Sequence, residues 1–581
     1  MVKIDGGEML VRMLEQEGID TLFVLHGGHL DSILQAAARH DMRLIDTRHE
    51  QAAGHAADGW ARTTGRTGVA VVTAGPGFTD CVTAIANAYL DCVPTLFISG
   101  AAPLREAETL PLQGGLDQVA IVEPITKWAH RVTNTHRIPD LVAQALRTAR
   151  TGRPGPVYLE VPIDVLFSME DEEALLTPQI AVPAAPPAPA DEVVEKALAL
   201  LIASERPAIY AGGGAWFSGA GPELLAFAEK TGIPVVMNSK ARGMVPADHP
   251  HCGGGLATLA MSSMAGAGPI DCLLILGARL GMFTGGRNNS MIPPDASVIQ
   301  VDIAPEEIGR NRDIQVGITA DCREALKCFN AAATERDWPD RSAWRESIGM
   351  LRGGADMMFA DALSSSEAPI HPYRLAHDVV AAIPPDAIVI ADGGETATWM
   401  EMAGAPQSGG SWLSHGYLGC LGTGMPFAIA AQVAHPGRPV VCVVGDGSVG
   451  LNFSEFDTMA RHDLPVVTVI NNDQLWGMSA HGQDLIYGQD KRVVTELGPT
   501  RYDLAAAGFG CHAELVEEPA EISAAIERAL ASGKPACVNV MTDPSVISPI
   551  TMMMVGSMGS EAPTDGEGGS ITIPYYEDLD R

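Results

Sequence analysis

The sequence predicts an α/β protein with three doubly wound parallel-sheet domains and a C-terminal tail. Its 581 residues correspond to about three to four domains at roughly 150 residues each. Short apolar segments alternate with helical stretches along most of the chain, which is typical of parallel sheets covered by helices on both faces. A Pro/Ala-rich stretch at 182–191 and a polar segment at 337–369 divide this alternation into three blocks. A surface loop within one domain is the alternative interpretation of 182–191.

Each block contains several apolar segments that we expect to be strands. In the first block, 1–182, they lie at 21–25, 43–47, 68–74, 95–100 and 156–161. In the second block, 192–335, they lie at 207–214, 234–238, 272–278 and 297–302. In the third block, 370–550, they lie at 387–394, 439–447, 465–473 and 535–541. The remaining residues, 551–581, form the tail.

Composition and charge exclude several classes of function. The chain has 71 acidic and 38 basic residues and a net charge of -33, so nucleic acids and anionic membrane surfaces are poor partners. No uninterrupted apolar run approaches the roughly 18 residues of a membrane span, and we expect no signal peptide. The ten cysteines form no C-x-x-C pair, which is typical of a reducing compartment without structural zinc. We therefore expect a cytoplasmic location and a small-molecule ligand.

A glycine-rich acidic loop is the strongest chemical signal. Gly445, Asp446, Gly447 and Ser448 end one apolar segment, and Asn471-Asn472 ends the next. Loops after parallel strands bind ligands in open α/β sheets. The Asp446 carboxylate, the Asn472 amide oxygen, the Gln474 backbone carbonyl and two diphosphate oxygens approach the octahedral oxygen shell of Mg²⁺. The glycines allow backbone N–H groups to reach phosphates.

A second glycine-rich turn follows an earlier segment of the same block. It contains Gly394, Glu395 and Thr396, and we expect it to face the same diphosphate. A plain turn between a strand and a helix is the alternative.

The first block contains a candidate catalytic carboxylate. Glu50 lies where an apolar segment gives way to a helix rich in small residues, in the run RHEQAAGHAADGWAR. By itself it could be a helix N-terminal glutamate favoured by the helix dipole. Its occurrence in one α/β domain, with a metal–diphosphate loop in another, favours a cofactor-binding role.

Together these segments resemble the thiamine diphosphate (ThDP) enzymes of the acetolactate synthase and pyruvate decarboxylase superfamily. The resemblance covers about 1–555, and segments such as LHGGHLDSI, LQGGLDQVA and ITKWAHRV are closest to the benzaldehyde lyase and 2-hydroxyacyl-CoA lyase branch. It implies that 1–182 binds the pyrimidine, 192–335 is the central domain and 370–550 binds diphosphate and Mg²⁺. It also implies a site shared between subunits, hence a homodimer at minimum and a homotetramer as the expected assembly.

The resemblance assigns roles to further residues. Glu50 would hydrogen-bond N1′ of the aminopyrimidine, and Leu421, next to Gly419, would support the bent cofactor. Gly75 and Pro76 would line the pyrimidine pocket. His29 and Gln113 would handle substrate protons and oxygens. His26 has no assigned role, and a structural histidine is expected there.

Several positions depart from the benzaldehyde lyase pattern. Ile163 and Ala397 replace a Trp and a Tyr, which would open the pocket to a longer substrate such as an acyl-CoA. Glu496 would be an additional catalytic group near the entrance, with a solvated surface glutamate as the alternative. Arg287 could meet a nucleotide phosphate, with a surface arginine as the alternative. The tail, 551–581, could be an active-site lid or an assembly element.

The middle block carries no FAD signature, although a nucleotide such as ADP or the CoA moiety could bind near Asp302. We therefore expect a ThDP- and Mg²⁺-dependent C–C lyase and carboligase acting on 2-hydroxy ketones or 2-hydroxyacyl-CoA thioesters. The alternatives are a 2-keto acid decarboxylase or synthase of acetolactate synthase type and a non-catalytic ThDP-binding paralogue.

Overall fold

The computed structural model describes residues 2–174, 178, 185–284, 291–404 and 407–556. It confirms the predicted fold class, since three parallel sheets flanked by helices are present. The chain divides into two compact units, which are described separately. The first comprises Met1–Ala185, His415–Gly437 and Asn452–Val466, and the second comprises the described residues of Pro186–Ser414, Arg438–Leu451 and Val467–Arg581.

The first unit is built on a six-stranded sheet in the order β3-β2-β4-β5-β7-β6, with all neighbours parallel. Its strands are β2 (Thr21–Val24), β3 (Arg43–Asp46), β4 (Gly68–Val72), β5 (Thr95–Ala101), β6 (Trp128–Arg131) and β7 (Val157–Pro162). A small antiparallel pair joins β1 (Lys3–Asp5) to β8 (Met169–Asp171). The helices before residue 175 are α1 (Gly6–Gln16), α2 (Asp31–Arg39), α3 (Glu50–Thr64), α4 (Pro76–Leu90), α5 (Gln118–Val122), α6 (Ile138–Arg150) and α7 (Ile163–Leu166).

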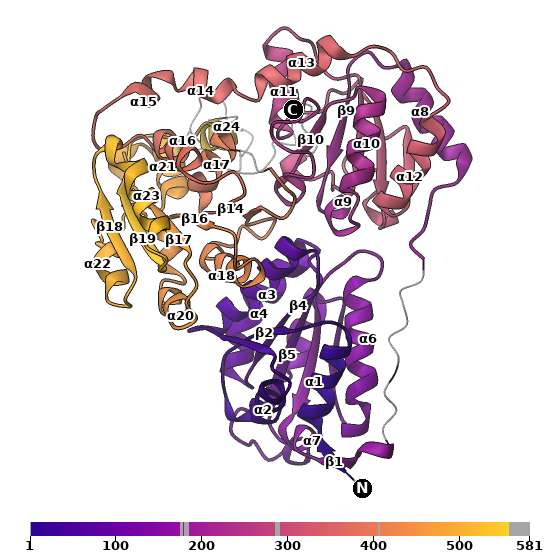
Figure 1. Cartoon of the computed structure of the whole chain (residues 1–581), viewed down its shortest axis with the longest axis vertical. Coiled ribbons are helices and arrows are strands. Elements are labelled where there is room, and N and C mark those ends of the chain that lie inside the picture. The colour runs from indigo at the N-terminus through magenta and orange to yellow at the C-terminus, as the bar shows by residue number, and fades with distance from the viewer. Residues whose placement is uncertain (1, 175–177, 179–184, 285–290, 405–406, 557–581) are drawn as a thin grey trace, which may run out of the picture. The chain divides into compact units, whose positions relative to one another are not determined.

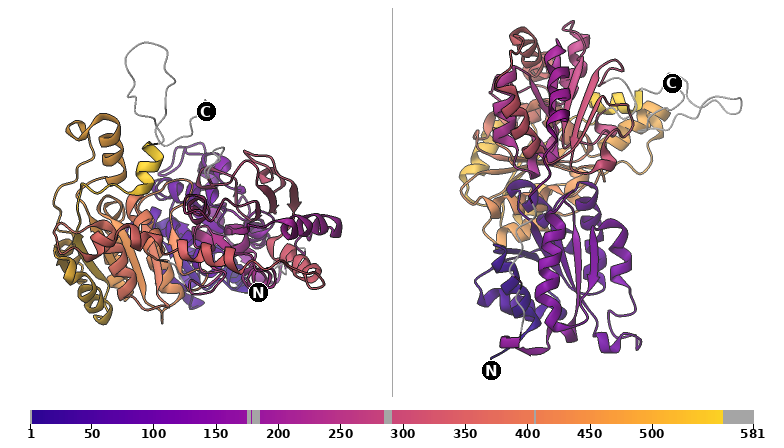
Figure 2. Two further views of the ribbon diagram at one scale, coloured as in Figure 1. Left: turned by 90° about the horizontal axis from the view of Figure 1, so that it is seen from above. Right: turned by 90° about the vertical axis from the view of Figure 1, so that its right-hand side faces the viewer.

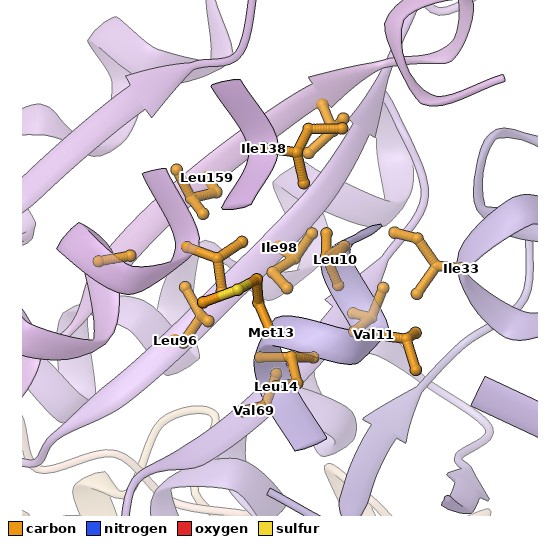
Figure 3. Close-up of a cluster of buried hydrophobic side chains, with 14 of the residues drawn as sticks. Leu10, Val11, Met13, Leu14, Ile33, Val69, Leu96, Ile98, Ile138 and Leu159 are labelled. Atoms are coloured by element: carbon orange, nitrogen blue, oxygen red, sulfur yellow. The ribbon is translucent and has the colours of Figure 1, made fainter. Parts of the chain in front are cut away.

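Alternating side chains of this sheet fill two apolar layers, because successive residues of a strand point to opposite faces. One layer packs against α1, α2 and α6, and Figure 3 shows Leu10 and Met13 of α1 gathered with Leu96, Ile98 and Leu159 of the strands. The opposite layer meets α3 and α4, where aromatic rings make close pairs: Phe23 with Trp60 and Phe78 with Tyr158.

Two helices from late in the sequence belong to this first unit, α18 (Gly424–Ala434) and α20 (Glu455–Arg461). The sequence analysis placed both in the 370–550 block. The close packing of α18 on α3 depends on a small residue, since a Cβ on Gly59 would lie 2.8 Å from the Phe427 Cα. Arg62 of α3 covers the Phe427 ring and is neutralised by buried Asp58 and Asp91.

The second unit contains two sheets. The central one has the order β10-β9-β11-β12-β13, all parallel. Its strands are β9 (Pro207–Ala211), β10 (Val235–Met237), β11 (Cys272–Leu276), β12 (Ser297–Asp302) and β13 (Val316–Thr319). Its helices are α8 (Asp191–Ala203), α9 (Gly213–Phe217), α10 (Gly221–Thr231), α11 (Ala257–Met264) and α12 (Cys322–Ala333).

The polar segment at 337–369 is helical rather than a simple connection. It forms α13 (Ser342–Leu351), α14 (Gly354–Met358) and α15 (Ala360–Ser364). Trp344 and Ile348 of α13 are buried against the central sheet, which explains why a segment that is polar overall is ordered there.

The third sheet has the order β15-β14-β16-β17-β19-β18 and is also parallel throughout (Figures 1 and 2). Its strands are β14 (Ile388–Asp392), β15 (Trp412–Ser414), β16 (Val440–Gly445), β17 (Val467–Asn472), β18 (His512–Val516) and β19 (Ala536–Met541). The helices of this part are α16 (Pro372–Ala382), α17 (Gly394–Ala403), α19 (Asp446–Gly450), α21 (Gly477–Tyr487), α22 (Tyr502–Ala507), α23 (Ile522–Ala531) and α24 (Pro549–Gly556).

Among the described residues, no helix combines the length and the apolar character needed to cross a bilayer. Two predictions fall outside the described residues: the role of Arg287, and that of the tail beyond Gly556, including its proposed lid function.

Candidate functional site

The pyrimidine-binding half of the candidate site lies at the carboxyl end of β4 in the first unit. Gly75 adopts a left-handed backbone with φ of 65°, which glycine tolerates without strain, and Pro76 opens helix α4 directly after it. The Thr73 side chain occupies the space beside Gly27 and Gly77, where a Cβ would come within 2.7 Å of it. The structure therefore brings the predicted Gly75–Pro76 turn to the edge of the sheet where ligands bind.

Glu50 begins helix α3 beside this turn. His49 caps the helix, because its Nδ1 accepts the Gln51 N–H at 3.1 Å. The Glu50 carboxylate is half-buried and lies over the first turn of α4, with Oε1 3.2 Å from the position of a Cβ on Gly77. Glycine at 77 thus leaves room for the carboxylate.

His29 and Gln113 approach the same turn from two loops. The Cβ and Cγ of Gln113 lie 3.1 and 3.2 Å from the position of a Cβ on Gly75, and Gln113 itself has an unusual left-handed φ of 59°. His29 Nδ1 lies 3.4 Å from Thr73 Oγ1. Burial lowers the pKa of His29, so the ring is neutral near pH 7 and can accept or donate a proton.

Gln118 is a residue of this half that the sequence analysis missed. Its Oε1 accepts the Gly75 N–H at 2.8 Å, and its Nε2 lies 3.1 Å from Ser99 Oγ, 3.2 Å from Tyr158 Oη and 3.1 Å from Glu160 Oε2. The side chain is 2% exposed. It therefore ties the cofactor turn to strands β5 and β7. A glutamine carries no signal for this role in the sequence.

Gly419 and Leu421 also belong to the first unit. Gly419 has a left-handed φ of 64°, and Leu421 is half-buried. Both neighbours of Leu421 are anchored: Cys420 Sγ lies 3.6 Å from His55 Nε2 of α3, and the Gly422 carbonyl accepts the Asn452 amide at 2.6 Å. Contacts on both sides therefore hold the backbone of Leu421, the residue predicted to support the bent cofactor.

The diphosphate-binding half lies in the second unit, at the carboxyl ends of β14, β16 and β17. Gly393, with φ of 108°, approaches the Gly445 backbone nitrogen so closely that a Cβ would lie 3.3 Å from it. Thr396 Oγ1 accepts the Asn471 amide at 3.0 Å. Gly447 faces the Trp476 ring, which leaves no room for a side chain. The predicted Gly394, Thr396 and Gly445–Ser448 are thus brought together by neighbouring strands.

The two most suitable metal ligands of this half are Asp446 and Asp473. Both are buried, at 2% and 8% exposure, and their carboxyls interact with each other. Burial and the Asp473 charge raise the pKa of Asp446, and burial raises the pKa of Asp473. Within the described residues, Asp446 Oδ2 has no hydrogen-bond partner. Two adjacent buried carboxylates with an open oxygen fit a hard divalent cation.

The structure is compatible with the predicted Asn472 and Gln474 ligands. The Asn472 amide donates to Asn539 Oδ1 at 3.0 Å and to the Thr500 carbonyl at 3.2 Å, although its Oδ1 has no hydrogen-bond partner among the described residues. The Gln474 carbonyl accepts the Leu497 N–H at 2.8 Å. The sequence analysis did not consider Asp473, although it is an acidic residue that directly follows the Asn471-Asn472 pair.

Glu395 lies near the loop but is engaged by protein groups. Its Oε2 meets His481 Nδ1 at 2.9 Å, and its Oε1 accepts the Ser548 N–H at 3.2 Å. His481 Nε2 lies 3.0 Å from the Pro544 carbonyl. Burial opposes protonation, but the Glu395 hydrogen bond raises the pKa of His481, so the two form a buried ion pair. Glu395 therefore links α17 to α21 and to Ser548, which precedes α24, and its contact with a diphosphate stays a prediction.

The remaining predicted residues lie in less specific surroundings. Glu496 is exposed and pairs through its backbone with Leu475 of the metal loop. Ala397 is buried in the core of the third sheet, at 5% exposure. Ile163 is half-buried at the start of α7. His26 is exposed and meets Asp31 at 2.8 Å, which agrees with its having no assigned role.

The glycine-rich loops of the central sheet pack against each other. A Cβ on Gly214 would lie 2.7 Å from the Gly277 Cα, and Gly213 is covered by the Lys240 side chain. Asp302 Oδ1 accepts the Ala304 N–H at 2.9 Å. These glycines serve backbone packing, so they give no support to a nucleotide site near Asp302.

Comparison with known proteins identifies the domains in which these residues lie. The chain matches the thiamine pyrophosphate enzyme N-terminal TPP binding domain at residues 4–121, the central domain at 194–329 and the C-terminal TPP binding domain at 392–540. It therefore belongs to the thiamine pyrophosphate enzyme family.

Relatives of known name are similar along nearly the whole chain. The acetolactate synthase large subunit IlvG of Mycobacterium tuberculosis is 38% identical over 94% of this chain and 97% of its own. The probable acetolactate synthase large subunit of Methanocaldococcus jannaschii is 33% identical over 94% and 93%. The acetolactate synthase isozyme 1 large subunit of Escherichia coli is 32% identical over 93% and 94%.

These relatives overturn the expected C–C lyase activity on 2-hydroxy ketones or 2-hydroxyacyl-CoA thioesters. The segments that suggested it, LHGGHLDSI, LQGGLDQVA and ITKWAHRV, are short, whereas these relatives match nearly the whole chain. The acetolactate synthase-type resemblance is supported over nearly the whole chain.

Proposed function

We propose that the chain is a ThDP- and Mg²⁺-dependent synthase that decarboxylates one 2-keto acid and joins the remaining acyl group to the carbonyl carbon of a second 2-keto acid. The observation that carries this proposal is the similarity to acetolactate synthase large subunits over 94% of the chain. For pyruvate, two molecules would give one acetolactate and one CO₂.

The second unit supplies the groups that would hold Mg²⁺ and the diphosphate. Asp446 and Asp473 provide two hard oxygen donors, and the N–H groups at the start of α19 and around Gly394 can approach phosphate oxygens. The cation would also offset the repulsion between a diphosphate and the two carboxylates.

The first unit supplies the proton-handling groups. When bound, ThDP supplies a nucleophilic carbon and an electron sink for the pair released with CO₂. Glu50 would share a proton with N1′ of the pyrimidine from its position over Gly77. Neutral His29 would exchange protons with a substrate oxygen, and Gln113 would donate a hydrogen bond to one.

We also propose a homodimer or homotetramer, as the family resemblance implies, because a site built from two kinds of domain can be completed by a second copy. Light scattering on the purified full chain tests the assembly, and a monomer that turns over substrate would contradict it.

The activity is tested with the purified chain, Mg²⁺, ThDP and pyruvate. We expect CO₂ and acetolactate in a ratio of one to one, with two pyruvate consumed, and no turnover when either cofactor is withheld. Acetoin and benzoin are offered in parallel, and Asp446→Ala is the inactive control. Cleavage of these acyloins without pyruvate consumption would contradict the proposal, as would one CO₂ per pyruvate with free acetaldehyde.

A further inference from the structure

A short turn, Asp46–His49, connects β3 to α3 and delivers Glu50. Helix α20 contacts both ends of this turn within the first unit. Arg461 bonds to Asp46 at Oδ2 (2.5 Å) and at the carbonyl (2.8 Å), and His462 Nε2 lies 2.7 Å from Asp46 Oδ1. At the other end, the Arg48 N–H donates to Glu455 Oε1 at 3.1 Å and to Oε2 at 3.3 Å.

Glu455 is an unusual group to find in this place. It is fully buried, and the hydroxyl of Thr458 donates to its Oε2 at 2.6 Å. Burial raises the pKa of Glu455 to about 7, while the Thr458 and Arg48 hydrogen bonds oppose the increase. The positive charges of Arg461 and Arg48 also lower this pKa. A buried carboxyl nevertheless costs stability, and an apolar residue would avoid that cost. The proposed synthase mechanism uses Glu50 and leaves Glu455 without a role.

Glu455 contacts the backbone at Arg48, two residues before Glu50. Because α3 begins at Glu50, the direction of its first turn depends on the Arg48 and His49 peptides. The link before α20 is anchored as well, since the Asn452 amide donates to the Gly422 carbonyl beside Leu421. One segment, Asn452–Arg461, therefore contacts the surroundings of two predicted site residues.

We propose that Glu455 is a positioning residue for Glu50: by accepting the Arg48 N–H, it fixes the turn that places the Glu50 carboxylate over Gly77. This inference rests on the proposed function only for the role of Glu50. The contact between Glu455 and the turn is independent of that function.

The first measurement reports the turn itself. Amide hydrogen exchange of peptides covering residues 46–51 is followed by mass spectrometry in the full chain without cofactor. We expect Glu455→Ala to increase exchange in this segment by about tenfold or more, because the Arg48 N–H loses its acceptor. Glu455→Gln keeps one acceptor oxygen and should restore exchange to within about threefold of the wild type. Unchanged exchange in Glu455→Ala would overturn the proposal.

The second measurement reports the effect on Glu50. Proton exchange at C2 of bound ThDP is followed by quenched-flow NMR, and Mg²⁺-ThDP affinity by calorimetry. We expect Glu455→Ala to slow C2 exchange by about ten- to hundredfold, the scale of a misplaced catalytic group, with affinity unchanged within about threefold. Glu455→Gln should recover most of the rate. Equal losses of rate and affinity would indicate a purely structural role and overturn the proposal.

Two further variants complete the test. Asp457→Asn is the matched control, since Asp457 lies on the same helix 3.7 Å from the Arg48 guanidinium without contacting the Arg48 amide. Asp457 also pairs with Arg461, and asparagine keeps an oxygen that can accept the Arg461 Nε–H. This variant should change C2 exchange less than about twofold. If Glu455→Ala does not fold, Thr458→Val takes its place, because it removes only one hydrogen bond to Glu455. It should change both measurements in the sense expected for Glu455→Ala: faster amide exchange in segment 46–51 and slower proton exchange at C2 of ThDP. No effect of Thr458→Val would then overturn the proposal.

A wild type without C2 exchange would refute the proposed function, while the response of segment 46–51 would still report the turn.

Discussion

Asp473→Asn tests whether the metal site contains two carboxylates. The substitution keeps the oxygen that accepts the Leu475 N–H at 3.0 Å and removes one negative charge beside Asp446. It should therefore stabilise the metal-free protein against unfolding and destabilise the metal-bound protein. The metal-free protein loses a repulsion, and the metal-bound protein loses an attraction.

The magnitude follows from the burial of the pair. Two unit charges 4 Å apart repel by about 4 kcal/mol at an effective dielectric constant of 20. Because the raised pKa of each carboxyl lets the metal-free site hold a proton near neutral pH, only part of this repulsion is present. We expect the free energy of unfolding of the metal-free protein to rise by about 1–3 kcal/mol and Mg²⁺ affinity to fall by about tenfold or more.

The assay is urea denaturation with and without Mg²⁺ and ThDP, followed by tryptophan fluorescence. Trp476 is a suitable reporter because its ring packs on Gly447 in the metal loop. Asn472→Ala is the matched control, since it removes the amide oxygen that the sequence predicted as a ligand. If Asp473→Asn leaves both midpoints unchanged while Asn472→Ala abolishes the Mg²⁺ effect, the assignment of Asp473 is wrong.

Three other substitutions probe the half-sites. Glu50→Gln should retain ThDP binding but slow C2 proton exchange by about a hundredfold, because an amide cannot share the N1′ proton. NMR of quenched samples measures this rate, and a wild-type rate would exclude Glu50 as the group that assists the exchange. Asp446→Ala should abolish Mg²⁺-dependent ThDP binding in calorimetry, and an unchanged affinity would place the metal elsewhere. Gln118→Ala leaves the buried Gly75 N–H without its acceptor and should lower the free energy of unfolding by about 1–3 kcal/mol in urea denaturation while weakening ThDP binding. Wild-type stability and binding would show that Gln118 does not hold the turn.

The sequence predicted the central strands of the parallel sheets and two of their edge strands, β3 and β10, and missed the other four edge strands. Strands such as β4 and β16 are covered on both faces and form continuous apolar runs, which the pattern detects directly. The edge strands β6, β13, β15 and β18 were not predicted. In β13 buried and exposed residues alternate, and β18 is only half-buried along most of its length, so neither forms an apolar run.

In the candidate site, too, residues marked by a local sequence pattern could be predicted, and residues that act through distant contacts could not. Asp446 and Glu50 could be identified because each directly follows a strand or begins a helix. Weighing Asp473 against Asn472 as a metal ligand requires the direction in which the chain leaves β17, where Gln474 has a left-handed φ of 62°. Gln118 and Glu455 act through contacts with residues far away in the sequence, at Gly75 and Arg48. No local pattern encodes such contacts.

The buried acids of this strongly acidic chain indicate where the proposed cation would matter most. Asp58 and Asp91 share the positive charge of Arg62, and Glu395 pairs with His481. Glu455 has a pKa of about 7, so a proton can neutralise it.

Asp446 and Asp473 differ from all of these. Among the described residues, neither makes an ion pair with Lys, Arg or His, and they repel each other. Such a pair is expensive to retain in a folded protein unless a ligand compensates it. A divalent cation provides that compensation, and a cation held there by carboxylates can attract a diphosphate to a protein whose net charge of -33 would otherwise repel it.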